Sequence, residues 1–158
     1  MNENKSTLDL TDSILRILGI IGFFAAVISG FIFAGGNLFT LIHIPEIIIV
    51  VGTIFFGLLC THRTRFLSYL PKALLACLAK PSPDREYCQI SDNAMRYAAF
   101  GGGMAVILSL ISTMSNLADP EGVGLRVAAA MSGVVIAMLL SQGLFVYLQY
   151  SFSENGSK

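Results

Sequence analysis

The residues of this chain that could act on an ion or on water are hydroxyl side chains within two long apolar runs. A serine or threonine hydroxyl donates one hydrogen bond and accepts others, so a row of them can contact a cation or hold water. They occur in the segments 98–117 and 127–147, as Ser109, Ser112, Thr113 and Ser132. The pattern predicts contact with a small ion or with water.

Small residues recur at every fourth position in these two runs and in the first apolar run of the chain. Small side chains let helix backbones approach closely, which is how helices associate in a membrane. The first run carries Gly22, Ala26 and Gly30, and the fourth carries Ala129, Gly133, Ala137 and Ser141. In the first run we expect packing within one subunit. In the third and fourth runs the added hydroxyls make a narrow, mildly polar face that could line a partner helix or a thin file of water.

Asp, Glu, Lys, Arg and His are missing from the central part of every apolar run. Glu46 and His43 are predicted at an outer edge, and Arg96 and Arg126 at helix starts. A chain that moved protons or sodium alone would normally need a carboxylate at membrane depth. If ions cross here, we expect another chain to bring that carboxylate.

The composition is that of a membrane protein. The 158 residues are 54% hydrophobic and 13% charged, with a mean hydropathy of +0.72. A helix needs about 20 apolar residues to cross the hydrocarbon core. We therefore expect one all-helical membrane domain over 1–158, with four spans at about 17–34, 44–60, 98–117 and 127–147.

Basic residues gather in one connecting segment, 61–96, which holds six of the ten Lys and Arg residues. Because Lys and Arg accumulate on the cytoplasmic side of membranes, this asymmetry predicts that 61–96 and both termini are cytoplasmic. The chain is then a multi-pass protein with two short outer connections.

The segment 61–96 is short but contains a helical pattern. Its leucines recur at helical spacing among basic residues, as Leu67, Leu70, Leu74 and Leu78. This stretch could lie flat in the inner interface of the bilayer, or the second span could simply continue through it. Ser91 or Asp92 is predicted to cap the helix of the third span.

No enzyme signature or metal motif accompanies these features, and no role in nucleic-acid binding is predicted. Gly101-Gly102-Gly103 follows an aromatic residue and opens a membrane helix, without the strand that a nucleotide-binding glycine loop requires. The spacing of Cys60, Cys77 and Cys88 matches no metal site. We expect no enzymatic activity and no cofactor.

Two stretches resemble a known family of membrane proteins. The stretch GGNLFTLIHIPEIIIVVGT (35–53) resembles the end of helix one and the start of helix two in the MotA/TolQ/ExbB family, closest to MotA-type flagellar stator subunits. The stretch LADPEGVGLRVAAAMSGVVIAMLLSQG (117–143) looks like the outer turn and fourth helix of the same family. The resemblance covers all four spans and implies a bacterial inner membrane.

The resemblance also implies partners and roles. Such proteins form a homopentameric ring in the lipid bilayer around a pair of single-span partners of the MotB/TolR/ExbD type, whose membrane Asp carries the ion. By this resemblance Pro120 corresponds to the functional proline at the outer ends of helices three and four. Gly133 and Val134 fall where a small residue and a threonine face the partner's Asp.

Two departures from the family pattern bear on function. Val134 lacks the expected hydroxyl, so the polar contact could shift to Ser132 or be absent. The segment 61–96 is also much shorter than the cytoplasmic domain by which flagellar stators act on a rotor. The leading interpretation is a pore-forming subunit of an ion-driven rotary motor or stator-like complex, with H⁺ the first and Na⁺ the second candidate ion. The alternative is a non-conducting membrane scaffold or assembly protein of the same fold.

Overall fold

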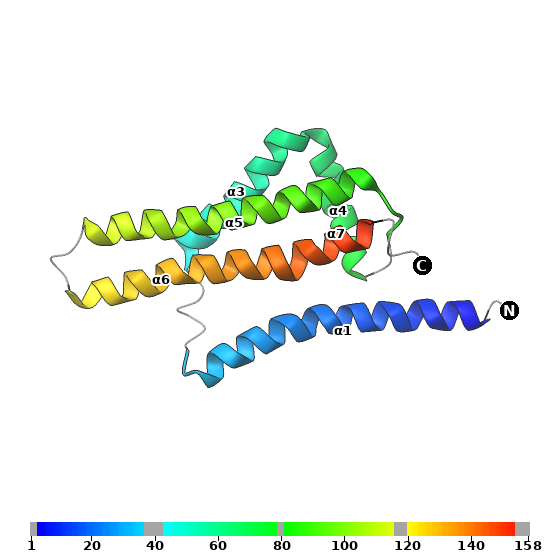
Figure 1. The fold of residues 1–158 in the computed structure, drawn as a ribbon, viewed down its shortest axis with the longest axis horizontal. Helices are drawn as coiled ribbons and strands as arrows, with labels where there is room; N and C mark the ends of the chain where they lie inside the picture. Colours follow the sequence, from blue (N-terminus) through cyan, green and yellow to red (C-terminus); the bar gives the residue numbers. More distant parts are fainter. Residues whose placement is uncertain (1–2, 37–42, 79–80, 116–119, 154–158) are drawn as a thin grey trace.

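The protein is built from long helices. The computed structural model describes residues 3–36, 43–78, 81–115 and 120–153, and every regular element in these ranges is helical. In chain order the elements are α1 (Glu3–Phe33), α3 (Ile44–His62), α4 (Thr64–Leu78), α5 (Arg85–Met114), α6 (Pro120–Met138), the π-helix η1 (Leu139–Phe145) and α7 (Val146–Phe152). Figure 1 shows α5 beside the continuous rod formed by α6, η1 and α7, with α1 along that rod's other side.

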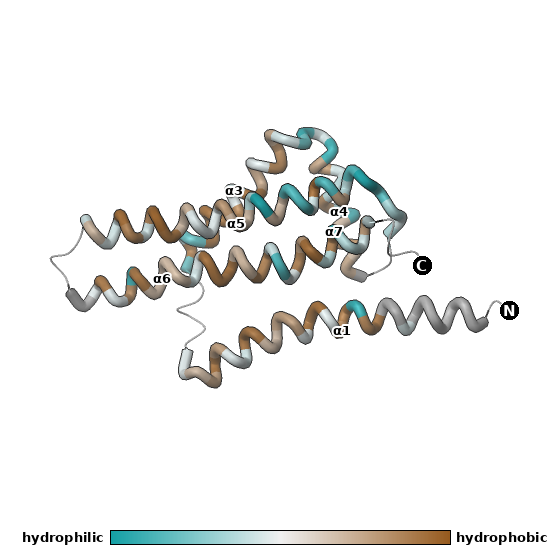
Figure 2. Tube along the Cα trace, viewed as in Figure 1, coloured by the Kyte–Doolittle hydropathy of each residue, from teal (hydrophilic) through white to brown (hydrophobic). Residues whose placement is uncertain are grey.

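Four helical stretches are long and apolar enough to cross a membrane, as the sequence predicts. They cover Ile14–Phe33, Ile44–His62, Arg85–Met114 and Gly122–Phe152. Figure 2 shows that the hydrophilic residues of α5 gather in its first half, while its second half is mostly hydrophobic. The expected fold class, all-helical with four candidate spans, is confirmed for the described residues.

The third span begins earlier than predicted. Its helix starts at Arg85, and Asp84 is the cap, because its extended backbone lets its carboxylate accept a hydrogen bond from the backbone N–H of Glu86 at 2.9 Å. Ser91 and Asp92, the predicted caps, lie inside the helix. The predicted end of this span at Leu117 lies outside the described residues.

The segment 61–96 is mostly helix. The second span ends at His62, where Arg63 takes a positive φ of 47° and turns the chain, so the interpretation in which that span runs on is wrong. The separate helix α4 buries Phe66 and Tyr69 and leaves its leucines exposed. Its exposed leucines are Leu67, Leu70, Leu74 and Leu75. An outward row of leucines suits a helix lying in a membrane interface.

The fourth span contains a π-helix that no sequence pattern indicated. Between Leu139 and Phe145 the turns widen, a rare feature that is often found at functional sites. Here α1 reaches the rod, since a β-carbon on Gly143 would lie 2.6 Å from Cε1 of Phe23. Glycine at 143 therefore permits the contact between α1 and η1.

The small residues of α1 pack against no other helix in the part of the chain that the structure describes. Gly22, Ala26 and Gly30 are all exposed, and β-carbons built on the two glycines would meet nothing within 4 Å. The expectation that this set serves packing inside one subunit is wrong. Spacing alone predicts that helices can approach closely, but it does not identify the partner helix.

An aromatic cluster, Tyr69, Tyr87 and Phe152, joins α4, α5 and α7 at one end of the molecule. The three ring centroids lie 5.4–6.0 Å apart, and the hydroxyls of Tyr69 and Ser91 are hydrogen-bonded at 2.9 Å. The backbone N–H of Asp84 donates to the carbonyl of Phe152 at 3.1 Å. The described ends of the chain lie at this same end of the bundle (Figure 1). We call it the α4 end.

The aromatic cluster should make stability sensitive to alkaline pH. Burial raises the pKa of Tyr69 to about 12, from 10.0. The folded state thus favours the neutral phenol, and this contribution is present below pH 10 and lost as pH rises from 10 to 12. We expect Tyr69→Phe to cost ~1 kcal/mol at neutral pH through its lost hydrogen bond, and to reduce the fall in melting temperature between pH 10 and 12. The measurement is thermal melting of the purified chain across that pH range.

Tyr150→Phe is the matched control, because Tyr150 is exposed. Its melting temperature should equal that of the unaltered chain at neutral pH and from pH 10 to 12. An unchanged alkaline decline in Tyr69→Phe would contradict the role given to Tyr69.

Candidate functional site

The closest helix contact in the predicted site joins α5 to α6. A β-carbon built on Gly102 would lie 2.5 Å from Cβ of Ala137, and one built on Gly133 would lie 2.9 Å from Cβ of Ala105. Carbon atoms do not pack at these distances, so the two helix backbones meet where glycine faces alanine. The structure thus places Gly133 and Ala137 inside the subunit, at the α5–α6 interface.

A second close contact joins α5 to α3. A β-carbon on Gly101 would lie 3.1 Å from Cα of Val50, and one on Gly57 would lie 2.8 Å from the ring of Tyr97. Neighbouring glycines of α5 therefore serve different helices, because Gly101 faces α3 and Gly102 faces α6. The consequence is a tight three-helix core of α3, α5 and α6.

The predicted hydroxyls are mostly engaged with backbone carbonyls. The hydroxyl of Ser109 donates to the carbonyl of Arg126 at 3.3 Å, that of Thr113 to Ser109 at 2.8 Å, and that of Ser132 to Ala129 at 2.7 Å. Thr113 and Ser132 are buried, whereas Ser112 is exposed. Ser132, the substitute considered for the missing hydroxyl at Val134, thus points into the packed interior.

Val134, Ala137 and Ser141 come together at a cavity of about 650 Å³ between α1, α5 and the α6–η1 rod. From α1 it is lined by Phe23 and Val27. Most lining side chains are apolar. The polar exception besides Ser141 is Gln142, which the sequence reasoning passed over although an amide in an apolar run was the available signal.

The other predicted positions are more dispersed. Ala129 and Ser141 are buried, as helix-packing residues should be. Pro120 is the first residue of α6, but its side chain lies outside the described residues. Among the described residues no three His, Cys, Asp or Glu side chains gather in a group that could hold a metal ion.

Glu46 stands at the start of its span but is buried against α6. It lies in the first turn of α3 and is only 5% exposed. A β-carbon built on Gly133 would lie 3.4 Å from Cβ of Glu46. Figure 1 shows the start of α3 behind the middle of the bundle, away from the ends of α5 and α6 that lie opposite the α4 end. Glu46 thus stands at the first turn of its span, as the sequence predicts, but this turn lies partway along α5 and α6.

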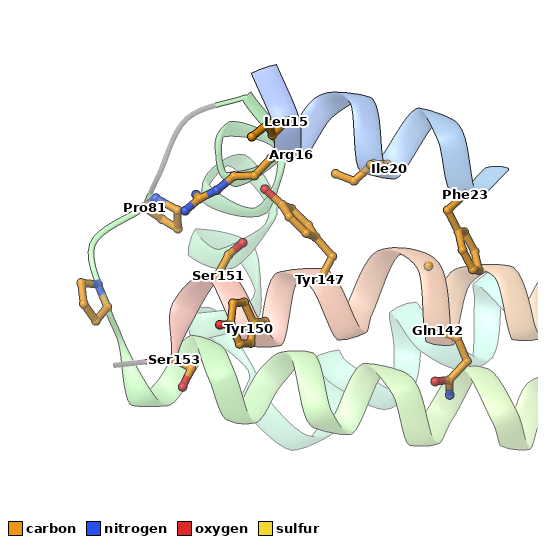
Figure 3. A pocket seen from close by; sticks show the side chains of 13 residues that line it. Leu15, Arg16, Ile20, Phe23, Pro81, Gln142, Tyr147, Tyr150, Ser151 and Ser153 are labelled. Atoms are coloured by element: carbon orange, nitrogen blue, oxygen red, sulfur yellow. The ribbon is translucent and has the colours of Figure 1, made fainter. Parts of the chain in front are cut away.

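A second cavity, of about 410 Å³, lies between α1, the α6–α7 rod and the segment around Pro81. Figure 3 shows Arg16 reaching across it above Tyr147, with Tyr150 and Ser151 on its far side. Arginine with tyrosines is typical of a membrane interface. This level marks the α4 end of the spans.

Residues 17–90 match the family model described as "Motility protein A N-terminal". The match covers just under half of the chain, including all of α3 and α4. It supports membership of the MotA/TolQ/ExbB type of membrane protein. The search of curated proteins and the search of solved structures each found no match.

The α5–α6 contact generates a direct test. In Gly102→Ala the new methyl group must displace α6, and we expect the unfolding free energy to fall by ~1–3 kcal/mol, as for overpacked cores. The neighbouring change Gly103→Ala is the control, since nothing lies within 4 Å of its β-carbon position. Thermal melting of the purified chain in detergent measures both. Equal melting temperatures for the two variants would refute the packing described here.

Proposed function

We propose that this chain, a membrane protein of the MotA/TolQ/ExbB type, is the pore-forming subunit of an ion-driven rotary or stator-like complex in a bacterial inner membrane. It works with a single-span membrane partner that supplies the ion-carrying Asp. H⁺ is the first candidate ion and Na⁺ the second. The membrane character, the four candidate spans and the family match support this assignment.

The observation that carries the proposal is a missing chemical group. α5 and the rod of α6, η1 and α7 pack closely, yet they contain no Asp, Glu, Lys, Arg or His from Tyr97 to Met114 or from Val127 to Phe152. Ion movement through a membrane normally uses ionisable side chains at depth. A partner helix carrying an acid would supply what these two helices lack.

Assembly into a ring, proposed as a pentamer, is supported by the surface of the single chain. The small face of α1, with Gly22, Ala26 and Gly30, is exposed in the described part of the chain, and nothing there lies within 4 Å of the β-carbon positions of the two glycines. Large apolar side chains are also exposed on α3 and α5, among them Phe56 and Ile111. Lipid can cover the apolar residues, but a row of small residues is best filled by another helix.

The proposed orientation places the α4 end in the cytoplasm. That end holds both described chain ends and α4, whose segment carries most of the basic residues. The level of Arg16, Tyr147 and Tyr150 then marks the inner interface.

A second candidate function is a non-conducting scaffold of the same fold. It is favoured by the apolar lining of the larger cavity, where Val134 takes the place of the family's threonine. A partner could bind such a surface without passing ions.

Ion flux separates the two functions. The chain is reconstituted in vesicles alone, with the single-span protein that co-purifies with it, and with that partner's membrane Asp changed to Asn. The proposal expects proton uptake only in the second case, because only there is the partner's membrane Asp present. Uptake should fall to the background of empty vesicles in the other two.

Flux by the chain without its partner would contradict the division of labour. A complex that assembles but passes neither H⁺ nor Na⁺ would establish the scaffold instead.

A further inference from the structure

Glu46 is a buried carboxylate that the proposed function does not use. It is 5% exposed, and its Oε2 atom is fully buried without a hydrogen-bond partner among the described residues. It belongs to the first turn of α3, preceded by Pro45 and by the capping residue His43. A helix N-terminus favours a negative charge nearby, yet no described backbone N–H satisfies this oxygen.

Its neighbours place Glu46 well inside the helix bundle. The β-carbon position of Gly133 lies 3.4 and 3.5 Å from Cβ and Cγ of Glu46, and 2.9 Å from Cβ of Ala105. Gly133 is seven residues beyond Arg126, which corresponds to ~10 Å along a helix rising 1.5 Å per residue. Arg126 is the charged residue of α6 nearest to this level. Glu46 therefore lies inward of the outermost charges, beside apolar parts of both helices.

Few charged groups can face this carboxylate from the helices packed against it. At the start of α3 the candidate is the capping residue His43, which is half-buried and lies three residues before Glu46. On α6 it is Arg126, whose guanidinium donates to the carbonyl of Ser112 at 3.5 Å. On α5 no Asp, Glu, Lys, Arg or His lies between Arg96 and Met114. Arg96 itself is paired with Asp92 at 3.1 Å.

An ionised carboxylate buried without a partner is costly, so such groups in membranes are paired, neutralised or part of an ion path. A hard metal cation would need about six oxygen ligands. Gly133, which lies against Glu46, and Ala105, which meets the same β-carbon position, have no side-chain oxygen. A single proton on the carboxylate neutralises the charge and needs no further ligand.

We propose that Glu46 is a proton-binding carboxylate of this chain, held at membrane depth where the start of α3 meets Gly133 of α6. It gives the subunit an acid of its own beside the helices that lack one. The inference deepens the proposed function. Proton binding by Glu46 needs only this chain, whereas a role of that proton in ion transport rests on the proposed function.

A hydrophobic carbodiimide, dicyclohexylcarbodiimide, tests the site without requiring transport. The O–H of a protonated carboxyl adds across a C=N bond of the reagent, and the adduct rearranges to a stable N-acylurea with no leaving group. The purified full chain, in detergent and in vesicles, is treated over a range of pH and the modified peptide is found by mass spectrometry. We expect modification at Glu46, slowed as pH rises, and its complete loss in Glu46→Gln.

Glu86 provides the matched control. Its side chain is 40% exposed and lies 3.2 Å from Arg65, so Glu86→Gln should leave the labelling unchanged. Melting of each variant checks that the fold is retained, which is expected for Glu46→Gln because Gln keeps the size of Glu. If Glu46→Gln does not fold, the unaltered chain still decides the question through the position of the label.

Three results would overturn the proposal. The first is a chain in which Glu46 stays unlabelled at every pH. The second is labelling of Glu46 no faster than that of Glu86. The third is protection of Glu46 by Na⁺ at constant pH, which would make it a sodium site. The flux experiment tests the proposed function separately. A complex that passes no ions can still be modified by the carbodiimide at Glu46.

Discussion

The structure depends on the close approach of α3, α5 and α6 through positions that have no room for a larger side chain. Gly102 meets Ala137, Gly133 meets Ala105, and Gly101 meets the backbone of Val50. In a membrane, lipid is as apolar as the helices, so this close packing replaces the hydrophobic effect as the force that joins them. It also fixes how far along its neighbours each helix begins. Because Gly133 lies against Glu46, the same contacts that hold the core set the depth of the buried carboxylate.

The rest of the chain is held more loosely, and the difference has a physical cause. α4, α5 and α7 are tied at one end by the Tyr69, Tyr87 and Phe152 rings and by a buried hydroxyl pair. By contrast α1 touches the bundle near Gly143 and leaves its small residues uncovered. The apolar stretch of α1 has so little surface buried in the subunit that lipid, or other chains in the proposed ring, must cover it. This is the behaviour expected of a subunit whose final packing is completed by assembly.

Sequence patterns predicted the four apolar helices and the small residues of α6, because both depend on local composition and spacing. They could not predict which helix each small residue meets, so Gly101 and Gly102 could not be distinguished. The small residues of α1 were expected to pack within the subunit, and no described residue packs against them. The cap at Asp84 and the π-helix at Leu139–Phe145 are set by tertiary contacts. The burial of Glu46 is set by tertiary contacts as well. Its position in the sequence marks the start of a helix, but only the packing against Gly133 shows that this start lies within the bundle.

The central claim is therefore one of depth, and spin-label accessibility tests it most directly. Three exposed positions can carry the labels: Ile44 (68% exposed), Met131 (53%) and Leu125. Ile44 precedes Glu46 by two residues and Met131 precedes Gly133 by two residues, while Leu125 lies near the start of α6. Nitroxides at the three positions in vesicles are compared for collision with lipid-soluble oxygen and with a water-soluble nickel chelate. The account predicts equal depth at 44 and 131, both ~9 Å deeper than 125 along a helix of 1.5 Å rise per residue. A label at 44 as shallow as the one at 125 would contradict it.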